Sequence, residues 1–239
     1  MSAHRECCIN LKHFDEIVLS GDLHGDLLAL IKVLKLSRCV EIDPGEEKMA
    51  QACPVAQDSQ QRHREIDRSR LRHYRWKNKC KKAIVFLGDI VDNRRFANDD
   101  AFGVCARTGT QTFMLMVLAH LKQQAERQGG KLLILLGNHD VANMQVGDQF
   151  CARFAPKYSA YHNQAGKHLT CDANGGYTRQ HCDAMKQLFA PWQYLTVGLL
   201  HYDDRPVGLL CHGGIDPDIF TTANPQYRLK ENDYIANVV

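Results

Sequence analysis

Four short strand-like runs, each followed directly by a glycine or histidine and further polar residues, constrain the fold of this chain most strongly. They cover residues 16–20, 83–87, 131–136 and 207–211. Nearly continuous apolar runs of this length are typical of strands that are buried on both faces. Apolar residues with helical spacing follow the first run and, over 110–127, precede the third. Because strand and helix patterns alternate, we predict an α/β fold.

The polar residues after the runs form four compact clusters. In chain order they read Gly-Asp-Leu-His-Gly-Asp (21–26), Gly-Asp-Ile-Val-Asp-Asn (88–93), Gly-Asn-His-Asp (137–140) and His-Gly-Gly (212–214). In α/β sheets, ligands bind beyond the carboxyl ends of the strands. The four clusters therefore predict one shared site at that edge of the sheet.

The residue types in these clusters suit metal ligation. Asp22 and His24 are two residues apart, so in an extended segment they share a face. Carboxylate, imidazole and amide oxygen ligands suit Mn, Fe or Zn, and a carboxylate such as Asp89 can bridge two cations about 3.5–4 Å apart. Taken singly, each cluster is ordinary turn chemistry, and His212 alone is compatible with a packed histidine. Four clusters in order favour a shared metal site.

Together the four clusters resemble the ordered motifs of the calcineurin-like metallophosphoesterase superfamily. They are most similar to its protein serine/threonine phosphatase branch and that branch's bacterial and viral relatives, and the resemblance runs from residue 16 to residue 217. It implies a β-sandwich flanked by helices in a single domain over residues 1–239. We expect a basic insertion at about 41–80 and an irregular insertion at about 143–190. The implied activity is hydrolysis of phosphomonoesters, with two divalent metal ions as cofactors.

The resemblance assigns a metal-binding role to five residues. It implies that Asp22 and His24 hold the first metal and that Asn138 and His212 hold the second. Asp89 would bridge the two ions. A water molecule between them would be the nucleophile that attacks phosphorus.

The resemblance also implies which residues act on the substrate. His139 would protonate the oxygen of the leaving group, and Asp92 would orient His139 and stabilise its charge. The protein phosphatases have a phosphate-binding arginine where this chain has Asn93. Arg94 and Arg95 follow it, and we expect them to bind the substrate phosphate, because a guanidinium group can bind two oxygens at once.

The sequence departs from the family pattern after His212. The superfamily has a further metal-binding histidine downstream, but the 27 residues after His212 contain none. We expect this chain to be part of a longer protein, so that the sandwich is incomplete at its C-terminal end; the alternatives are a substitute such as His201 or a degenerate site. Three functions stay open: a protein serine/threonine phosphatase, a nucleotide or dinucleotide-polyphosphate hydrolase, and a catalytically degenerate scaffold.

Charge is distributed unevenly along the chain. Ten of the 21 residues between Arg62 and Lys82 are Lys or Arg, against Glu65 and Asp67, although the whole chain carries a net charge of only +3. This run predicts either an acidic or nucleic-acid partner or, as we prefer, a solvated insertion. The expected substrate is a phosphorylated protein or a small phosphoester. Ten irregularly spaced cysteines, with no secretory signal and no membrane span, predict a cytoplasmic protein.

Overall fold

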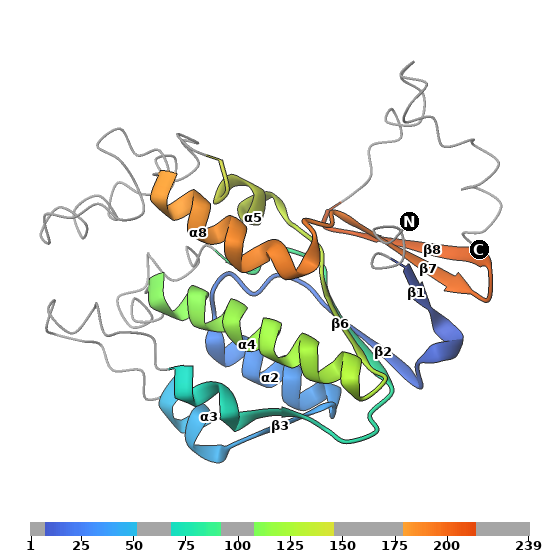
Figure 1. Ribbon diagram of the computed structural model, residues 1–239, viewed down its shortest axis with the longest axis horizontal. Helices are drawn as coiled ribbons and strands as arrows, with labels where there is room; N and C mark the ends of the chain where they lie inside the picture. Colours follow the sequence, from blue (N-terminus) through green and yellow to red (C-terminus); the bar gives the residue numbers. More distant parts are fainter. Residues whose placement is uncertain (1–7, 52–67, 92–107, 146–178, 214–239) are drawn as a thin grey trace, which may run out of the picture.

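The structure is a computed structural model of the 239-residue chain, and it describes residues 8–51, 68–91, 108–145 and 179–213. The main sheet is parallel and has the strand order β2-β5-β6 (Figure 1). Its strands are β2 (Glu16–Ser20), β5 (Lys82–Phe86) and β6 (Lys131–Ile134). Three of the four predicted strands therefore lie side by side in one sheet, and their carboxyl ends meet at one edge.

The fourth predicted strand belongs to a second sheet with the order β1-β7-β8. Its strands are β1 (Cys8–Asn10), β7 (Val197–Tyr202) and β8 (Arg205–Cys211). Strand β1 pairs in parallel with β7, and β7 pairs with β8 as an antiparallel hairpin. The mixed α/β class is thus confirmed. The predicted metallophosphoesterase sandwich is not confirmed, because the described residues form three small sheets and residues 214–239 lie outside them.

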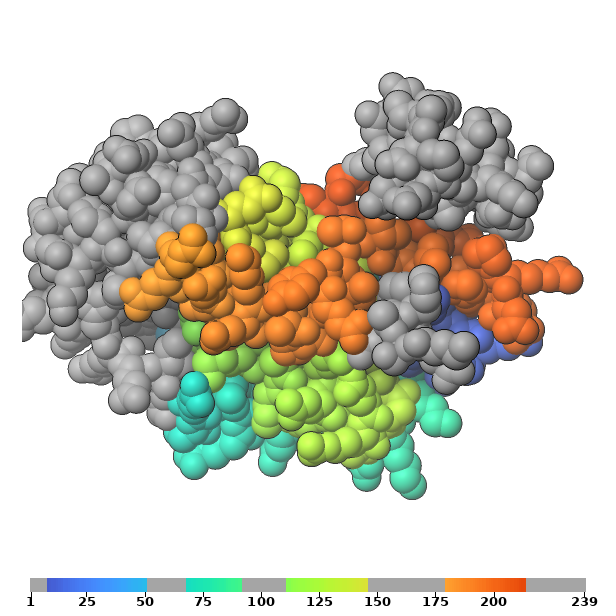
Figure 2. Space-filling view, turned by 45° about the horizontal axis from the view of Figure 1, so that its top comes forward, coloured from blue at the N-terminus to red at the C-terminus, as the bar shows by residue number. Residues whose placement is uncertain are grey.

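Helices pack along the main sheet. They are α2 (Leu27–Ser37), α4 (Thr108–Arg127) and α8 (Arg179–Phe189), with the short α5 (Asn138–Ala142) beyond β6. The 3-10 helix η1 (Leu11–His13) follows β1, and the 3-10 helix η4 (Ala190–Trp192) follows α8. Helix α4 lies against β6, α2 and α8. On one face of the molecule, α8 lies between α4 and α5 (Figure 2). No helix among the described residues combines the length and the apolar character needed to cross a membrane.

The core lies between β5 and the helices. All four residues from Ala83 to Phe86 are fully buried, as are Leu30, Ile31 and Leu34 on one face of α2. This spacing is the helical periodicity that the sequence shows after the first motif. Fully burying a side chain of this size contributes about 1.5–3 kcal/mol. The packed helices therefore hold the central strand, and with it the loop that follows β5.

The segment predicted as a basic insertion contains structure that the sequence did not indicate. Strands β3 (Val40–Ile42) and β4 (Tyr74–Trp76) form an antiparallel pair, and α3 (Pro44–Gln51) and the 3-10 helix η3 (Arg68–His73) lie between them in the chain. Helix α4 packs against β4, and one of its side chains hydrogen-bonds to the strand: Gln124 accepts a hydrogen bond from Trp76 N (2.8 Å) and donates one to the Tyr74 carbonyl (3.2 Å).

The described part of the basic run is partly neutralised within the fold. Four acidic side chains from other segments pair with it: Glu46 with Arg70, Glu41 with Arg75, Asp43 with His73, and Glu16 with Lys82. The solvated insertion over about 41–80 stays a prediction. The acidic or nucleic-acid partner expected between Arg62 and Lys82 stays a prediction.

Stability at alkaline pH is expected to depend on Cys39, which is fully buried at the start of β3. Burial raises the pKa of its thiol from 9.0 to about 11. The folded state therefore keeps a proton that the unfolded state releases above about pH 9, so this contribution is complete below pH 9 and is lost as the pH rises towards 11. Between pH 9 and pH 11 we expect the wild-type protein to lose about 2 kcal/mol of unfolding free energy through this thiol, and Cys39→Ala to lack that loss. The measurement is the unfolding free energy of both proteins at the two pH values. Equal losses of unfolding free energy in the two proteins would contradict this role of Cys39.

Candidate active site

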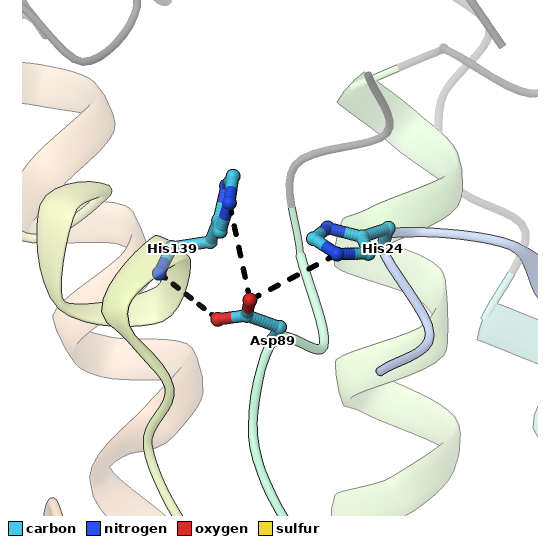
Figure 3. Close-up of side chains that lie close together, drawn as sticks. All are labelled: His24, Asp89 and His139. Atoms are coloured by element: carbon cyan, nitrogen blue, oxygen red, sulfur yellow. Dashed lines mark hydrogen bonds and ion pairs between the residues drawn. The ribbon is translucent and has the colours of Figure 1, made fainter. Parts of the chain in front are cut away.

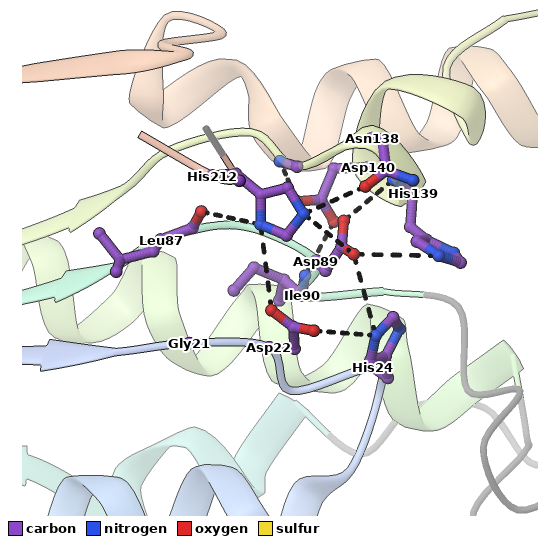
Figure 4. Close-up of polar contacts among 12 residues, drawn as sticks. Gly21, Asp22, His24, Leu87, Asp89, Ile90, Asn138, His139, Asp140 and His212 are labelled. Atoms are coloured by element: carbon purple, nitrogen blue, oxygen red, sulfur yellow. Dashed lines mark hydrogen bonds and ion pairs between the residues drawn. The ribbon is translucent and has the colours of Figure 1, made fainter. Parts of the chain in front are cut away.

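The four polar clusters converge beyond the ends of β2, β5, β6 and β8 (Figure 4). The structure brings six of the predicted site residues together: Asp22, His24, Asp89, Asn138, His139 and His212. Asp89 and His24 are buried, whereas Asp22 and Asn138 are exposed and His139 and His212 are partly exposed. Among the described residues of the site, Asp22, Asn138, His139 and His212 are therefore the ones open to solvent.

Asp89 is at the centre of the site and only 3% exposed. Its Oδ1 accepts a hydrogen bond from the backbone N–H of His139 at 3.0 Å (Figure 3). Its Oδ2 lies 3.2 Å from His212 Nε2, 3.8 Å from His24 Nε2 and 3.9 Å from His139 Nε2. One carboxylate thus faces three imidazole rings that come from the loop after β2, the start of α5 and the residue after β8.

His212 is surrounded by oxygen atoms on both sides of its ring. Its Nδ1 lies 3.1 Å from the Leu87 carbonyl and 3.9 Å from Asp22 Oδ1, and its Nε2 lies 3.1 Å from Asn138 Oδ1. Asp89 Oδ2 is a further oxygen beside Nε2, at 3.2 Å. The His212 ring therefore lies among oxygen atoms of four residues.

Among the described residues, two groups of three side chains could hold a metal ion, with ligand atoms within 4.8 Å of one another. One group is His24, Asp89 and His139, and the other is Asp22, Asp89 and His212. The resemblance in sequence had instead assigned Asp22 and His24 to the first metal ion and had not counted His139 among the metal ligands. Asp22 Oδ2 lies 3.5 Å from His24 Nε2, and the rings of His24 and His139 meet edge to face at 4.8 Å.

The backbone at the site is held in an uncommon conformation. His24 and Asp89 both have positive φ angles, 48° and 52°, which cost energy for residues other than glycine. The two loops support each other, because the Asp89 carbonyl accepts hydrogen bonds from Leu23 N (3.0 Å) and His24 N (2.8 Å). The packing of one loop against the other thus fixes where both side chains point.

Two motif glycines allow the loops to approach. A Cβ atom on Gly137 would lie 2.1 Å from Asp89 Oδ1 and 2.4 Å from Asp89 N, and one on Gly88 would lie 2.6 Å from Gly137 N. These neighbours are backbone atoms and a buried carboxylate, so they have no room to move. The glycines are therefore needed for close approach of the second and third motifs.

Gly137→Ala is expected to lower the free energy of unfolding by about 3 kcal/mol, because the added methyl group overlaps Asp89. Denaturation in urea measures the change. Gly21→Ala is the matched control, since a Cβ there meets nothing within 4 Å. Equal unfolding midpoints for the two variants would contradict the close packing of Gly137 against Asp89.

Asp140 is a buried residue of the site that the sequence reasoning missed. It is fully buried; its Oδ1 accepts hydrogen bonds from Ile90 N (2.9 Å) and Val91 N (3.1 Å), and its Oδ2 accepts one from Gly137 N (3.0 Å). Burial raises the pKa of its carboxyl group to about 7, against the lowering effect of these N–H groups. Its position three residues after Gly137, at the start of α5, is the signal that could have identified it as a capping carboxylate.

A second missed connection links the site to α8. Asn143 Nδ2 donates a hydrogen bond to the His139 carbonyl (2.9 Å), and His181 Nε2 lies 2.8 Å from Asn143 Oδ1. Both Asn143 and His181 are buried. Helix α8 therefore supports the end of α5 that carries His139.

Three predicted site residues, Asp92, Arg94 and Arg95, lie outside the described residues. His201, the possible substitute ligand, lies in β7 opposite Pro206. It belongs to neither of the two candidate metal groups found in the described part of the chain.

Comparison with known proteins yields two solved structures. A cold-active protein-tyrosine phosphatase from a psychrophilic Shewanella species is 17% identical with a TM-score of 0.47, and the match covers 86% of this chain and 44% of that one. The phosphatase domain of the Legionella effector WipB is 15% identical with a TM-score of 0.41, covering 85% and 64%. This chain thus spans less than two thirds of either structure. No family model matches, and no curated protein matches.

These descriptions contradict the assignment to the calcineurin-like metallophosphoesterase superfamily, since they name a protein-tyrosine phosphatase and a phosphatase domain. We therefore withdraw that family, together with its metal dependence and the two divalent ions (Mn, Fe or Zn). Short motifs of glycine, aspartate and histidine set the turns and donor atoms of a site, and similar chemistry recurs on unrelated folds. At these TM-scores the likeness says nothing about the activity of this chain.

Proposed function

We propose that the site binds and hydrolyses a phosphomonoester, with phosphoserine and phosphothreonine in proteins as the substrate class. The observation that carries the proposal is the position of Asp89, whose Oδ2 lies 3.2–3.9 Å from the Nε2 atoms of His24, His139 and His212. Hydrolysis of a phosphoester needs a proton donor for the leaving group and donors for the phosphoryl oxygens. Imidazole rings held in place by a buried carboxylate can supply both.

In this proposal the partly exposed residues contact the substrate. Asn138 and His212 face the phosphoryl oxygens. Water attacks phosphorus, the bond from phosphorus to the leaving oxygen breaks, and His139 gives its proton to that oxygen, while the protons of the water stay on the phosphate product. Asp22, His24 and Asp89 hold the rings in position. Asp92, Arg94 and Arg95 keep their expected roles as proposals, with Asp92 orienting His139 and the two arginines binding phosphate. The proposal assigns no cofactor.

The test compares phosphoserine, phosphothreonine and phosphotyrosine peptides, a dinucleotide polyphosphate and p-nitrophenyl phosphate as substrates. His139→Ala should lower the rate for the phosphoserine peptide by about 10²–10⁴, and the rate for p-nitrophenyl phosphate by much less, because p-nitrophenolate leaves without a proton. Each assay is repeated after treatment with a chelator, which reads the dependence on metal ions directly.

The control is His120→Ala, a histidine on α4 outside the site, which should retain the wild-type rates. Hydrolysis of the dinucleotide alone would replace the substrate class by the nucleotide alternative. A folded wild-type protein that hydrolyses none of these substrates would overturn the proposal and favour the scaffold. If His139→Ala lowers the rates for the phosphoserine peptide and for p-nitrophenyl phosphate equally, His139 is not the acid.

A further inference from the structure

One buried carboxylate beside the site has no role in the proposed reaction. The Asp140 side chain accepts hydrogen bonds from three backbone N–H groups, two in the loop after β5 and one at the start of α5. Ile90 and Val91 directly follow Asp89, and Gly137 precedes Asn138 and His139. One side chain therefore connects the loop that carries the central carboxylate to the loop that carries the proposed acid.

We propose that Asp140 is a positioning residue that sets the distance between Asp89 and His139; its effect on catalysis rests on the proposed function. The two loops already meet through the hydrogen bond from His139 N to Asp89 Oδ1 at 3.0 Å. The three N–H groups around Asp140 belong to buried residues. Since a buried N–H without a partner is costly, the loops stay where all three reach the carboxylate.

An aspartate side chain suits this arrangement, and an asparagine side chain does not. The two oxygen atoms of Asp140 accept all three bonds, whereas an asparagine has one acceptor oxygen and presents an NH₂ group to the remaining N–H. The space is also restricted, because a Cβ on Gly137 would overlap Asp89. The loops therefore have little freedom to adjust, and a change at Asp140 is transmitted to the Asp89–His139 pair.

The experiment compares Asp140→Asn with Glu46→Gln in assays of p-nitrophenyl phosphate and a phosphoserine peptide. Glu46 is a matched control because it is also a buried carboxylate with three hydrogen bonds, donated by Arg70 and Tyr74 in the α3–β4 segment. Both variants are assayed at a temperature where circular dichroism shows that they are folded. We expect Asp140→Asn to lower kcat about 30–100-fold, with KM changed by less than about threefold.

A purely structural role predicts a different result. In that case both variants lose stability, and both keep the wild-type kcat per folded molecule. A folded Asp140→Asn protein with wild-type kcat would overturn the proposal. If Asp140→Asn does not fold, Asp140→Glu keeps both acceptor oxygens but moves them by one methylene. A lowered kcat in that variant would support the proposal and a wild-type kcat would overturn it.

A second measurement separates this proposal from the proposed function. Nitrogen-15 spectra of the imidazole rings report the surroundings of each histidine without any substrate. In Asp140→Asn we expect the signals of His139 and His24 to shift while that of His120, on α4, stays in place. If the wild-type protein is inactive but the signals shift in Asp140→Asn, the positioning role is retained and the proposed reaction is rejected. Unshifted signals would reject the positioning role.

Discussion

Asp89→Asn is expected to lower kcat/KM by about 10³-fold or more while the protein stays folded. The substitution keeps the shape of the side chain and an oxygen that can accept the hydrogen bond from His139 N. It also keeps the backbone carbonyl that accepts from Leu23 and His24. What it removes is the negative charge that faces three imidazole rings. The rings would then lose the group that holds them together.

Steady-state kinetics and a urea titration on the same preparation measure this effect. Asp43→Asn is the control, because Asp43 is an exposed carboxylate that also accepts a backbone hydrogen bond, from Gly45 N. We expect that variant to retain wild-type rates. An Asp89→Asn protein that retained more than about a tenth of the wild-type kcat/KM would show that the charge of Asp89 is dispensable and would remove the basis of the proposed function.

Glu46→Ala is expected to cost about 3–5 kcal/mol of unfolding free energy, because it breaks a buried ion pair by removing one partner. Glu46 is 1% exposed. It accepts from Arg70 Nε (3.0 Å) and Nη2 (2.7 Å) and from the Tyr74 hydroxyl (2.9 Å). The variant removes the Glu46 acceptor from the Arg70 guanidinium group, which stacks on Phe113 at 4.4 Å, and from the fully buried hydroxyl of Tyr74.

Urea denaturation followed by circular dichroism measures the loss. Glu47→Ala, one residue further along α3, is the matched control, since Glu47 pairs with the exposed Lys35. A pair of this kind contributes less than about 1 kcal/mol. Equal losses in the two variants would mean that the Glu46 network contributes no more than a surface pair does.

Much of the main sheet could be predicted from local sequence. The run at 16–20 forms β2, and the runs at 83–87 and 131–136 form β5 and β6 within two residues at each end. Strand β1 could not be predicted, because it is three residues long and pairs with β7, about 190 residues away. Strands β3 and β4 are equally short, so their sequences show little periodicity. They are stabilised by packing against α2 and α4.

The motifs also indicated which residues would converge, because consecutive parallel strands bring their carboxyl ends to one edge. They did not indicate how these residues pair. His139 lies beside Asp89 and His24, and Asp22 lies beside His212, because the loop backbones turn at positive φ angles that the sequence does not specify. Asp140 was missed for a related reason: an acidic residue in a turn has the same sequence signature whether it faces water or three buried N–H groups.

The contact between α4 and β4 also bears on how the protein behaves at high concentration. The amide of Gln124 offers one acceptor and one donor to β4, at Trp76 N and the Tyr74 carbonyl, just as the peptide group of a neighbouring strand would. An uncovered strand edge invites pairing with another chain, which leads to aggregation. A single glutamine side chain thus makes two of the hydrogen bonds that a third strand would make at this edge of the two-stranded sheet, and those two backbone groups are not available for pairing with another chain.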